Sequence, residues 1–150
     1  MVAQISRRRT MRTDPQTVWD VLADFGAIHE WLPGVDHSCL LRTAPDGPVG
    51  TARRVQMGRI TLVETITEFT PPTAIAYDIA GLPRWLRRFN NHWTLHADGA
   101  ATAVTLTTTV DLGPGRIRGL AARLVCLVLA KLSSTTMLAA LATRSETHHA

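Results

Sequence analysis

The 150-residue sequence lacks the residue patterns on which most catalytic and metal-binding sites depend. Its two cysteines, Cys39 and Cys126, lie far apart and belong to no Cys-x-x-Cys or Cys/His spacing. We therefore expect two buried thiols, with neither a disulfide framework nor a metal site. The sequence also has no phosphate-binding glycine loop and no Ser-His-Asp set, so hydrolase, kinase and metalloenzyme functions have no support and no cofactor is expected.

Long hydrophobic runs and clustered positive charge are absent as well. The most apolar stretch, residues 124–130, is seven residues between Arg123 and Lys131, whereas a helix needs about 20 to span a bilayer. The first residues have no apolar segment typical of a signal peptide, so a cytoplasmic location is expected. The net charge of +4 comes from 15 arginines and one lysine, mostly dispersed and rarely beside aromatic residues, so nucleic-acid binding is not expected.

What remains is a chain of ordinary domain size with 45% hydrophobic and 19% charged residues. This composition is typical of a globular protein, and we expect one domain over residues 1–150. Residues 3–12 mix apolar and polar side chains in loose alternation, which predicts a first strand.

Two short helices are predicted after this strand. Asp14 or Thr13 can cap a helix that begins at Pro15, where the missing proline N–H would have no partner. Gly26 is predicted to break this helix, and residues 27–32 to form about two more turns. The apolar positions expected in the core are Val18, Leu22 and Phe25.

Residues 36–111 contain short runs rich in Thr, Val and Ile between turn signals, which predicts about six strands in an antiparallel meander. From Arg116 to about Arg144, apolar residues recur at helical spacing and predict one helix about 40 Å long. The fold class is therefore α+β: a curved seven-stranded antiparallel sheet around a long C-terminal helix, with two short helices between strands 1 and 2. Space left between such a sheet and its helix suits a small apolar ligand.

This arrangement resembles the START-like, or helix-grip (SRPBCC), superfamily, which includes polyketide cyclases/dehydrases, lipid-transfer domains and the birch-pollen-allergen relatives. One similar stretch, TDPQTVWDVLADFGAIHEWLPGV, matches the family at Val18-Trp19, Asp24 and Trp31-Leu32-Pro33. Another, GTARRVQMGRITLVETITEFTPP, matches at Gly50, Arg53, Gly58, Glu64 and Pro71-Pro72. The resemblance runs from about Ile5 to Glu146. It implies the fold but no single reaction, because members include enzymes, carriers and sensors.

The segment from Met57 to Ile60 predicts a two-residue hairpin, because Gly58 can supply the positive φ of a type II′ turn. In that register Val55 lies opposite Leu62 and Arg53 opposite Glu64, with Met57 opposite Ile60, and all six side chains point to one face. Four of the six are apolar, so we expect this face to line the cavity. The Arg-Glu pair either only fixes the strand register or orients a polar group of the ligand.

Neighbouring strands are expected to complete an apolar wall with scattered polar points. The predicted ligand-binding residues are Trp31, Arg53, Val55, Leu62, Glu64, Tyr77, Asn91, Trp93, Leu106, Thr108, Leu120 and Leu124. In an enzyme, Arg53 would hold an anion, Glu64 would act as a base and Tyr77 would donate a proton. The connection of residues 81–89, with Trp85 among arginines, is either a solvated loop or a lid that touches a membrane surface or an anionic carrier.

Three functions are compatible with this pattern. The first is a carrier or sensor that binds a hydrophobic small molecule, such as a lipid, polyketide, isoprenoid or steroid-like compound. The second is an enzyme similar to the polyketide cyclases/dehydratases, acting in the same cavity. The third is a protein-interaction or dimerisation module that uses the apolar last helix. The sequence leaves open whether the chain is a monomer or a homodimer, and whether it makes transient membrane contact.

Overall fold

The computed structural model describes residues 2–82, 87–111 and 118–147. The elements in chain order are β1 (Val2–Met11), α1 (Pro15–Ala23), the 3₁₀ helix η1 (Phe25–Glu30), β2 (His37–Arg42), β3 (Ala52–Met57), β4 (Ile60–Thr70), β5 (Ala74–Ala80), β6 (Arg88–Asp98), β7 (Ala101–Asp111) and α2 (Arg118–Thr147).

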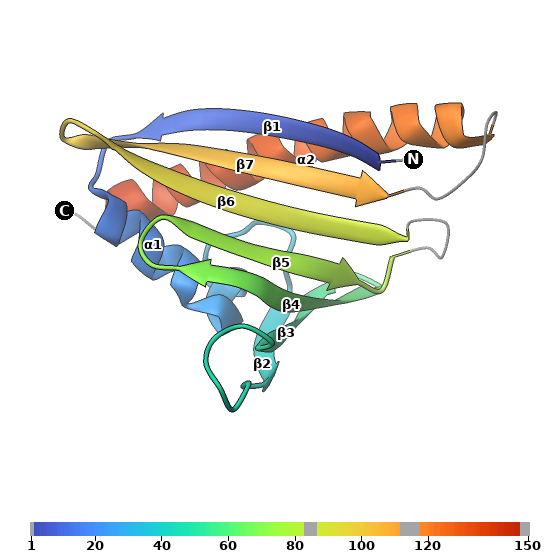
Figure 1. Ribbon diagram of the computed structural model, residues 1–150, viewed down its shortest axis with the longest axis horizontal. Coiled ribbons are helices and arrows are strands. Elements are labelled where there is room, and N and C mark those ends of the chain that lie inside the picture. Colours follow the sequence, from blue (N-terminus) through green and yellow to red (C-terminus); the bar gives the residue numbers. More distant parts are fainter. Residues whose placement is uncertain (1, 83–86, 112–117, 148–150) are drawn as a thin grey trace.

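The seven strands form one antiparallel sheet in the order β1-β7-β6-β5-β4-β3-β2 (Figure 1). Strands β2 to β7 follow one another as a meander, and β1 pairs with β7 at the edge of the sheet. Helix α2 runs along one face of the sheet, while α1 and η1 lie near the C-terminal end of α2 (Figure 1). The predicted class is thus confirmed, including the two short helices between the first and second strands. No described helix is long and apolar enough to cross a membrane.

The helix pair begins where predicted but divides earlier. Asp14 accepts a hydrogen bond from the backbone N–H of Thr17 at 3.3 Å and caps α1, with Pro15 in the first turn. The helix ends before Gly26, and the two turns predicted over residues 27–32 are instead a 3₁₀ helix that starts at Phe25. A Cβ at Gly26 would lie 3.1 Å from Cγ of Leu40. This glycine therefore permits close approach of β2 rather than breaking the helix.

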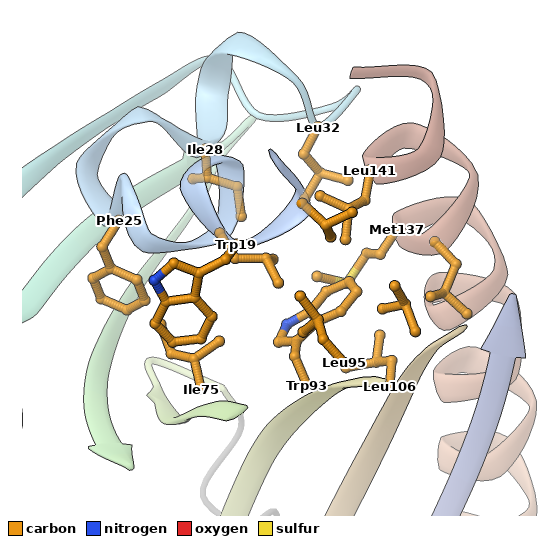
Figure 2. Packing of buried hydrophobic residues seen from close by; sticks show 14 of the residues in the cluster. Trp19, Phe25, Ile28, Leu32, Ile75, Trp93, Leu95, Leu106, Met137 and Leu141 are labelled. Carbon is orange, nitrogen blue, oxygen red and sulfur yellow. The ribbon is translucent and has the colours of Figure 1, made fainter. Parts of the chain in front are cut away.

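A hydrophobic core fills one end of the space between the sheet and α2. Trp93 and Leu106 of the sheet meet Met137 and Leu141 of α2 there, beside Trp19 of α1 (Figure 2). The three core positions predicted from the first helices are confirmed, with Val18, Leu22 and Phe25 at 0%, 6% and 5% exposure. The bulky aromatic side chains therefore fill this part of the space between the sheet and α2.

Two expectations about burial are wrong. Cys39 is exposed, because β2 is the outermost strand of the sheet; the side chain of Cys126 lies outside the described part of the structure. Leu124 of α2, expected to contact the ligand, is also exposed, and with Val128 and Leu132 it forms an exposed stripe at a spacing of four residues. These three side chains therefore face away from the sheet.

Candidate functional site

A partly open cavity of about 190 Å³ lies between the middle of α2 and the sheet and adjoins the hydrophobic core. Strands β3 to β7, α2 and the region around η1 all contribute to its wall. The apolar lining residues are Ile28, Leu32, Val55, Met57, Leu62, Ile79, Leu82, Phe89, Ala130 and Met137. The polar lining residues are Glu64, Asn91, Thr108 and Ser133. An apolar wall with a few polar groups is the usual composition of a small-molecule site.

The hairpin of β3 and β4 builds one side of this wall in the predicted register. Gly58 has φ of 60°, as the first loop position of a type II′ turn requires. Val55 lies opposite Leu62 and Arg53 opposite Glu64. Met57 lies opposite Ile60 as predicted and lines the cavity, but Ile60 is exposed and does not.

The predicted Arg53–Glu64 pair is confirmed, and Arg53 contacts only one of the two carboxylate oxygens of Glu64 at hydrogen-bond distance. Nε of Arg53 donates to Oε1 of Glu64 at 2.7 Å, and Nη2 forms an ion-pair contact with the same oxygen at 2.7 Å. Nη1 of Arg53 donates to the backbone carbonyl of Phe25 at 2.9 Å. The two side chains are buried, at 3% and 6% exposure, but only Glu64 reaches the cavity wall. Arg53 is therefore the support of the carboxylate rather than a part of the lining.

A second buried network begins at two polar lining residues. Oγ1 of Thr108 donates to Oδ1 of Asn91 at 2.8 Å, and Nδ2 of Asn91 donates to the hydroxyl oxygen of Tyr77 at 3.4 Å. Nε1 of Trp93 donates to the same oxygen at 3.3 Å. Burial, and then the nearby carboxylate of Glu64, raise the pKa of Tyr77. The phenol is therefore held in its neutral form.

The structure brings five of the predicted ligand-binding residues together in the cavity wall: Val55, Leu62, Glu64, Asn91 and Thr108. Four others are buried behind it, namely Arg53, Tyr77, Trp93 and Leu106. Their strands present the predicted inner faces, but these side chains pack into the filled end of the core or support the wall.

The remaining three predicted positions fall elsewhere. Trp31 lies at the end of η1 and lines a separate surface pocket of about 370 Å³ beside α1, together with Arg144 and acidic side chains. Leu124 is 67% exposed and does not line the cavity, because its face of α2 turns away from the sheet. The side chain of Leu120 lies outside the described part of the structure.

Met57 lines the cavity, as expected from its place on the predicted hairpin face. Several other lining residues were not predicted. Ile79 shares a strand face with the predicted Tyr77, so strand alternation alone could have added it. Ala130, Ser133 and Met137 follow one face of α2 at helical spacing, but which face meets the sheet is set by packing. Leu82 and Phe89 line the cavity on either side of residues 83–86. Trp85, the aromatic residue of the predicted lid, lies outside the described residues.

No group of three or more His, Cys, Asp or Glu side chains that could hold a metal ion occurs among the residues described. The polar groups of the cavity wall are instead one carboxylate, one amide and two hydroxyls. Such a set can orient a ligand by hydrogen bonds.

The fold and the cavity together define a helix-grip protein, and comparison of its sequence identifies the family within this class. The chain belongs to the family described as polyketide cyclase/dehydrase and lipid transport, whose model matches residues 2–146. No curated protein matches the chain.

Solved structures share the fold over nearly the whole chain. The Zhui aromatase/cyclase from Streptomyces sp. R1128 is 18% identical, with a TM-score of 0.80 over 97% of this chain and 94% of that one. A START superfamily protein from Mycobacterium smegmatis is 14% identical, with a TM-score of 0.72 over 96% and 97% of the two chains. A protein from Thermobifida fusca is 25% identical, with a TM-score of 0.76 over 95% and 92%.

Proposed function

We propose that this protein binds a hydrophobic small molecule in the cavity between the sheet and α2, and acts as a carrier or sensor. The observation that carries the proposal is the wall itself, which is apolar except for Glu64, Asn91, Thr108 and Ser133. A ligand that covers the apolar wall gains roughly 25 cal/mol for each Å² of apolar surface removed from water. The family description, which includes lipid transport, agrees with this role.

A variant that fills the cavity tests the proposal. Ala130 is 4% exposed and lines the cavity, so Ala130→Leu places three more carbon atoms where the ligand would lie. Thr135→Leu is the matched control, because this residue is exposed on the same helix and does not line the cavity. Isothermal titration calorimetry with toluene should detect binding to the wild type and to Thr135→Leu, and none to Ala130→Leu. Equal binding to all three proteins, or binding to none, would contradict the proposal.

A cyclase- or dehydratase-like activity is the second candidate, and one observation favours it. Glu64 lies in the cavity wall and can act as a base, and Asn91 links the cavity to the neutral phenol of Tyr77. Arg53 and Tyr77 lie behind the wall, which favours the carrier or sensor role over this one. An enzyme should lose turnover of a polyketide-like substrate in Glu64→Gln and Tyr77→Phe while it still binds the substrate. A carrier should show changes in affinity alone.

A further inference from the structure

Glu64 has one carboxylate oxygen without a hydrogen-bond partner among the described residues. Arg53 contacts Glu64 at Oε1, to which Nε donates at 2.7 Å and near which Nη2 lies at 2.7 Å, and no described residue donates a hydrogen bond to Oε2. Glu64 is also the one charged residue among the described lining of the cavity. Oε2 is not among the described side-chain atoms that are fully buried without a partner, so it is accessible from the cavity that Glu64 lines. The cavity therefore favours a ligand that brings a hydrogen-bond donor to this oxygen.

Arg53 does not line the cavity, so it does not meet a ligand anion there. Its Nε donates to Glu64, its Nη2 lies in ion-pair contact with Glu64, and its Nη1 donates to the carbonyl oxygen of Phe25. The guanidinium packs over the rings of Phe25 and Tyr77, 3.8 Å and 4.8 Å from their centroids, and does not line the cavity. A ligand carboxylate would thus lose its hydration in an apolar space, find no guanidinium in the lining to pair with, and face Oε2 of Glu64, which can only accept a hydrogen bond.

The neighbouring polar groups also offer acceptors. Thr108 uses its proton to donate to Asn91, so the lone pairs of its hydroxyl oxygen remain for the ligand. One N–H of Asn91 donates to Tyr77. Oε2 of Glu64 and the hydroxyl oxygen of Thr108 can therefore accept hydrogen bonds from a ligand, while the second N–H of Asn91 and the hydroxyl of Ser133 can donate to it.

The volume of the cavity limits the size of the ligand. An apolar cavity of about 150 Å³ engineered in another protein holds one benzene molecule. The cavity here is slightly larger, at about 190 Å³. It therefore has room for one aromatic ring with a small substituent, and less than a multi-ring molecule or a long acyl chain requires.

From these observations we infer that the cavity selects an uncharged, single-ring hydroxylated molecule, a phenol, whose hydroxyl donates to Oε2 of Glu64. This inference rests on the proposed ligand-binding function and adds the chemical class of the ligand. It excludes fatty acids and other carboxylates, which an apolar cavity alone would also accommodate.

Calorimetry of the wild-type protein with three probes tests the inference without any substitution. The probes are 4-methylphenol, 1,4-dimethylbenzene of nearly the same shape, and benzoate. A hydrogen bond to a charged acceptor predicts that the phenol binds roughly ten- to a hundredfold more tightly than dimethylbenzene. Benzoate should bind most weakly. Equal affinity of the phenol and dimethylbenzene, or tightest binding of benzoate, would overturn the inference.

The Glu64→Gln variant tests whether Glu64 causes the preference for the phenol over dimethylbenzene, because the substitution replaces the carboxylate acceptor by an amide that can donate. The advantage of the phenol over dimethylbenzene should fall to within about threefold. Glu68→Gln is the matched control on the same strand, since Glu68 is half-exposed and does not line the cavity. An unchanged preference in Glu64→Gln would contradict the assignment.

The outcomes also separate this inference from the function on which it rests. If dimethylbenzene binds the wild type but not Ala130→Leu, and the phenol binds no better, the cavity binds ligands and only the phenol inference falls. If no probe binds the wild type, both fall.

Discussion

Arg53 and Phe25 contact each other in two ways: the guanidinium lies 3.8 Å from the centroid of the Phe25 ring, and its Nη1 donates to the Phe25 carbonyl at 2.9 Å. Phe25 opens η1, and Arg53 belongs to β3. One side chain therefore fastens the short helices to the sheet while it neutralises Glu64 on the next strand. The wall of the cavity depends on this arrangement, because η1 and β4 both contribute to it.

Removing Arg53 alone should destabilise the protein more than removing the pair. In Arg53→Met the carboxylate of Glu64 stays buried without its partner, and we expect a loss of about 3–5 kcal/mol in the free energy of unfolding. In Arg53→Met/Glu64→Leu no charge remains, and most of that loss should be recovered. Urea unfolding of the wild type, both single variants and the double variant gives the coupling. Additive effects would show that the two charges do not stabilise each other.

Tyr77→Phe should weaken the buried network below the cavity. It removes the oxygen that accepts hydrogen bonds from Asn91 and Trp93, and we expect a loss of about 1–3 kcal/mol. Ser6→Ala is the control, since it deletes a solvent-exposed hydroxyl pair with Thr107, and should change stability by less than about 0.5 kcal/mol. The measurement is the free energy of unfolding of each variant relative to the wild type. A loss in Tyr77→Phe no larger than that of the control would mean that the network contributes nothing.

The single tyrosine of the chain permits a direct pH test. Burial and Glu64 raise the pKa of Tyr77 above 10.0 in the folded state. Above pH 10 the unfolded chain releases this proton and the folded protein retains it, so the folded state binds more protons and stability falls as pH rises. The stability due to this group is complete below pH 10 and is lost as pH approaches the folded-state pKa.

Tyrosinate absorbance should therefore appear at higher pH in the native protein than in the urea-unfolded protein. Tyr77→Phe should show a smaller decline of stability with alkaline pH than the wild type. Coincident titration curves for the native and unfolded protein would contradict the placement of Tyr77 in the core.

Local chemistry made part of the site predictable. The glycine at position 58 determines the hairpin, the hairpin determines the register, and the register places Arg53 opposite Glu64. Alternation along the later strands likewise identified the inner face that carries Tyr77, Asn91 and Thr108. Each of these inferences needs only neighbours in sequence or a two-residue turn.

The remainder depends on packing between distant segments. The rotation of α2 about its axis places Ala130 and Met137 at the cavity and Leu124 in solvent. Because apolar residues occur around much of the circumference of this helix, their spacing did not indicate which face contacts the sheet. The sequence also did not indicate how much of the concave face is filled by aromatic side chains, because this depends on how their volumes pack together. Trp93 is fully buried in the core and therefore limits the cavity instead of lining it.

Native mass spectrometry of the freshly purified protein, with organic extraction of whatever it releases, tests the central claim most directly. We predict a mass above that of the 16.4 kDa chain, or its homodimer, from a bound hydrophobic small molecule with a hydroxyl group. The excess should be absent from Ala130→Leu and present in Thr135→Leu. A bare protein mass, together with no thermal stabilisation by toluene, 4-methylphenol or 1,4-dimethylbenzene, would contradict the claim that this cavity binds a ligand.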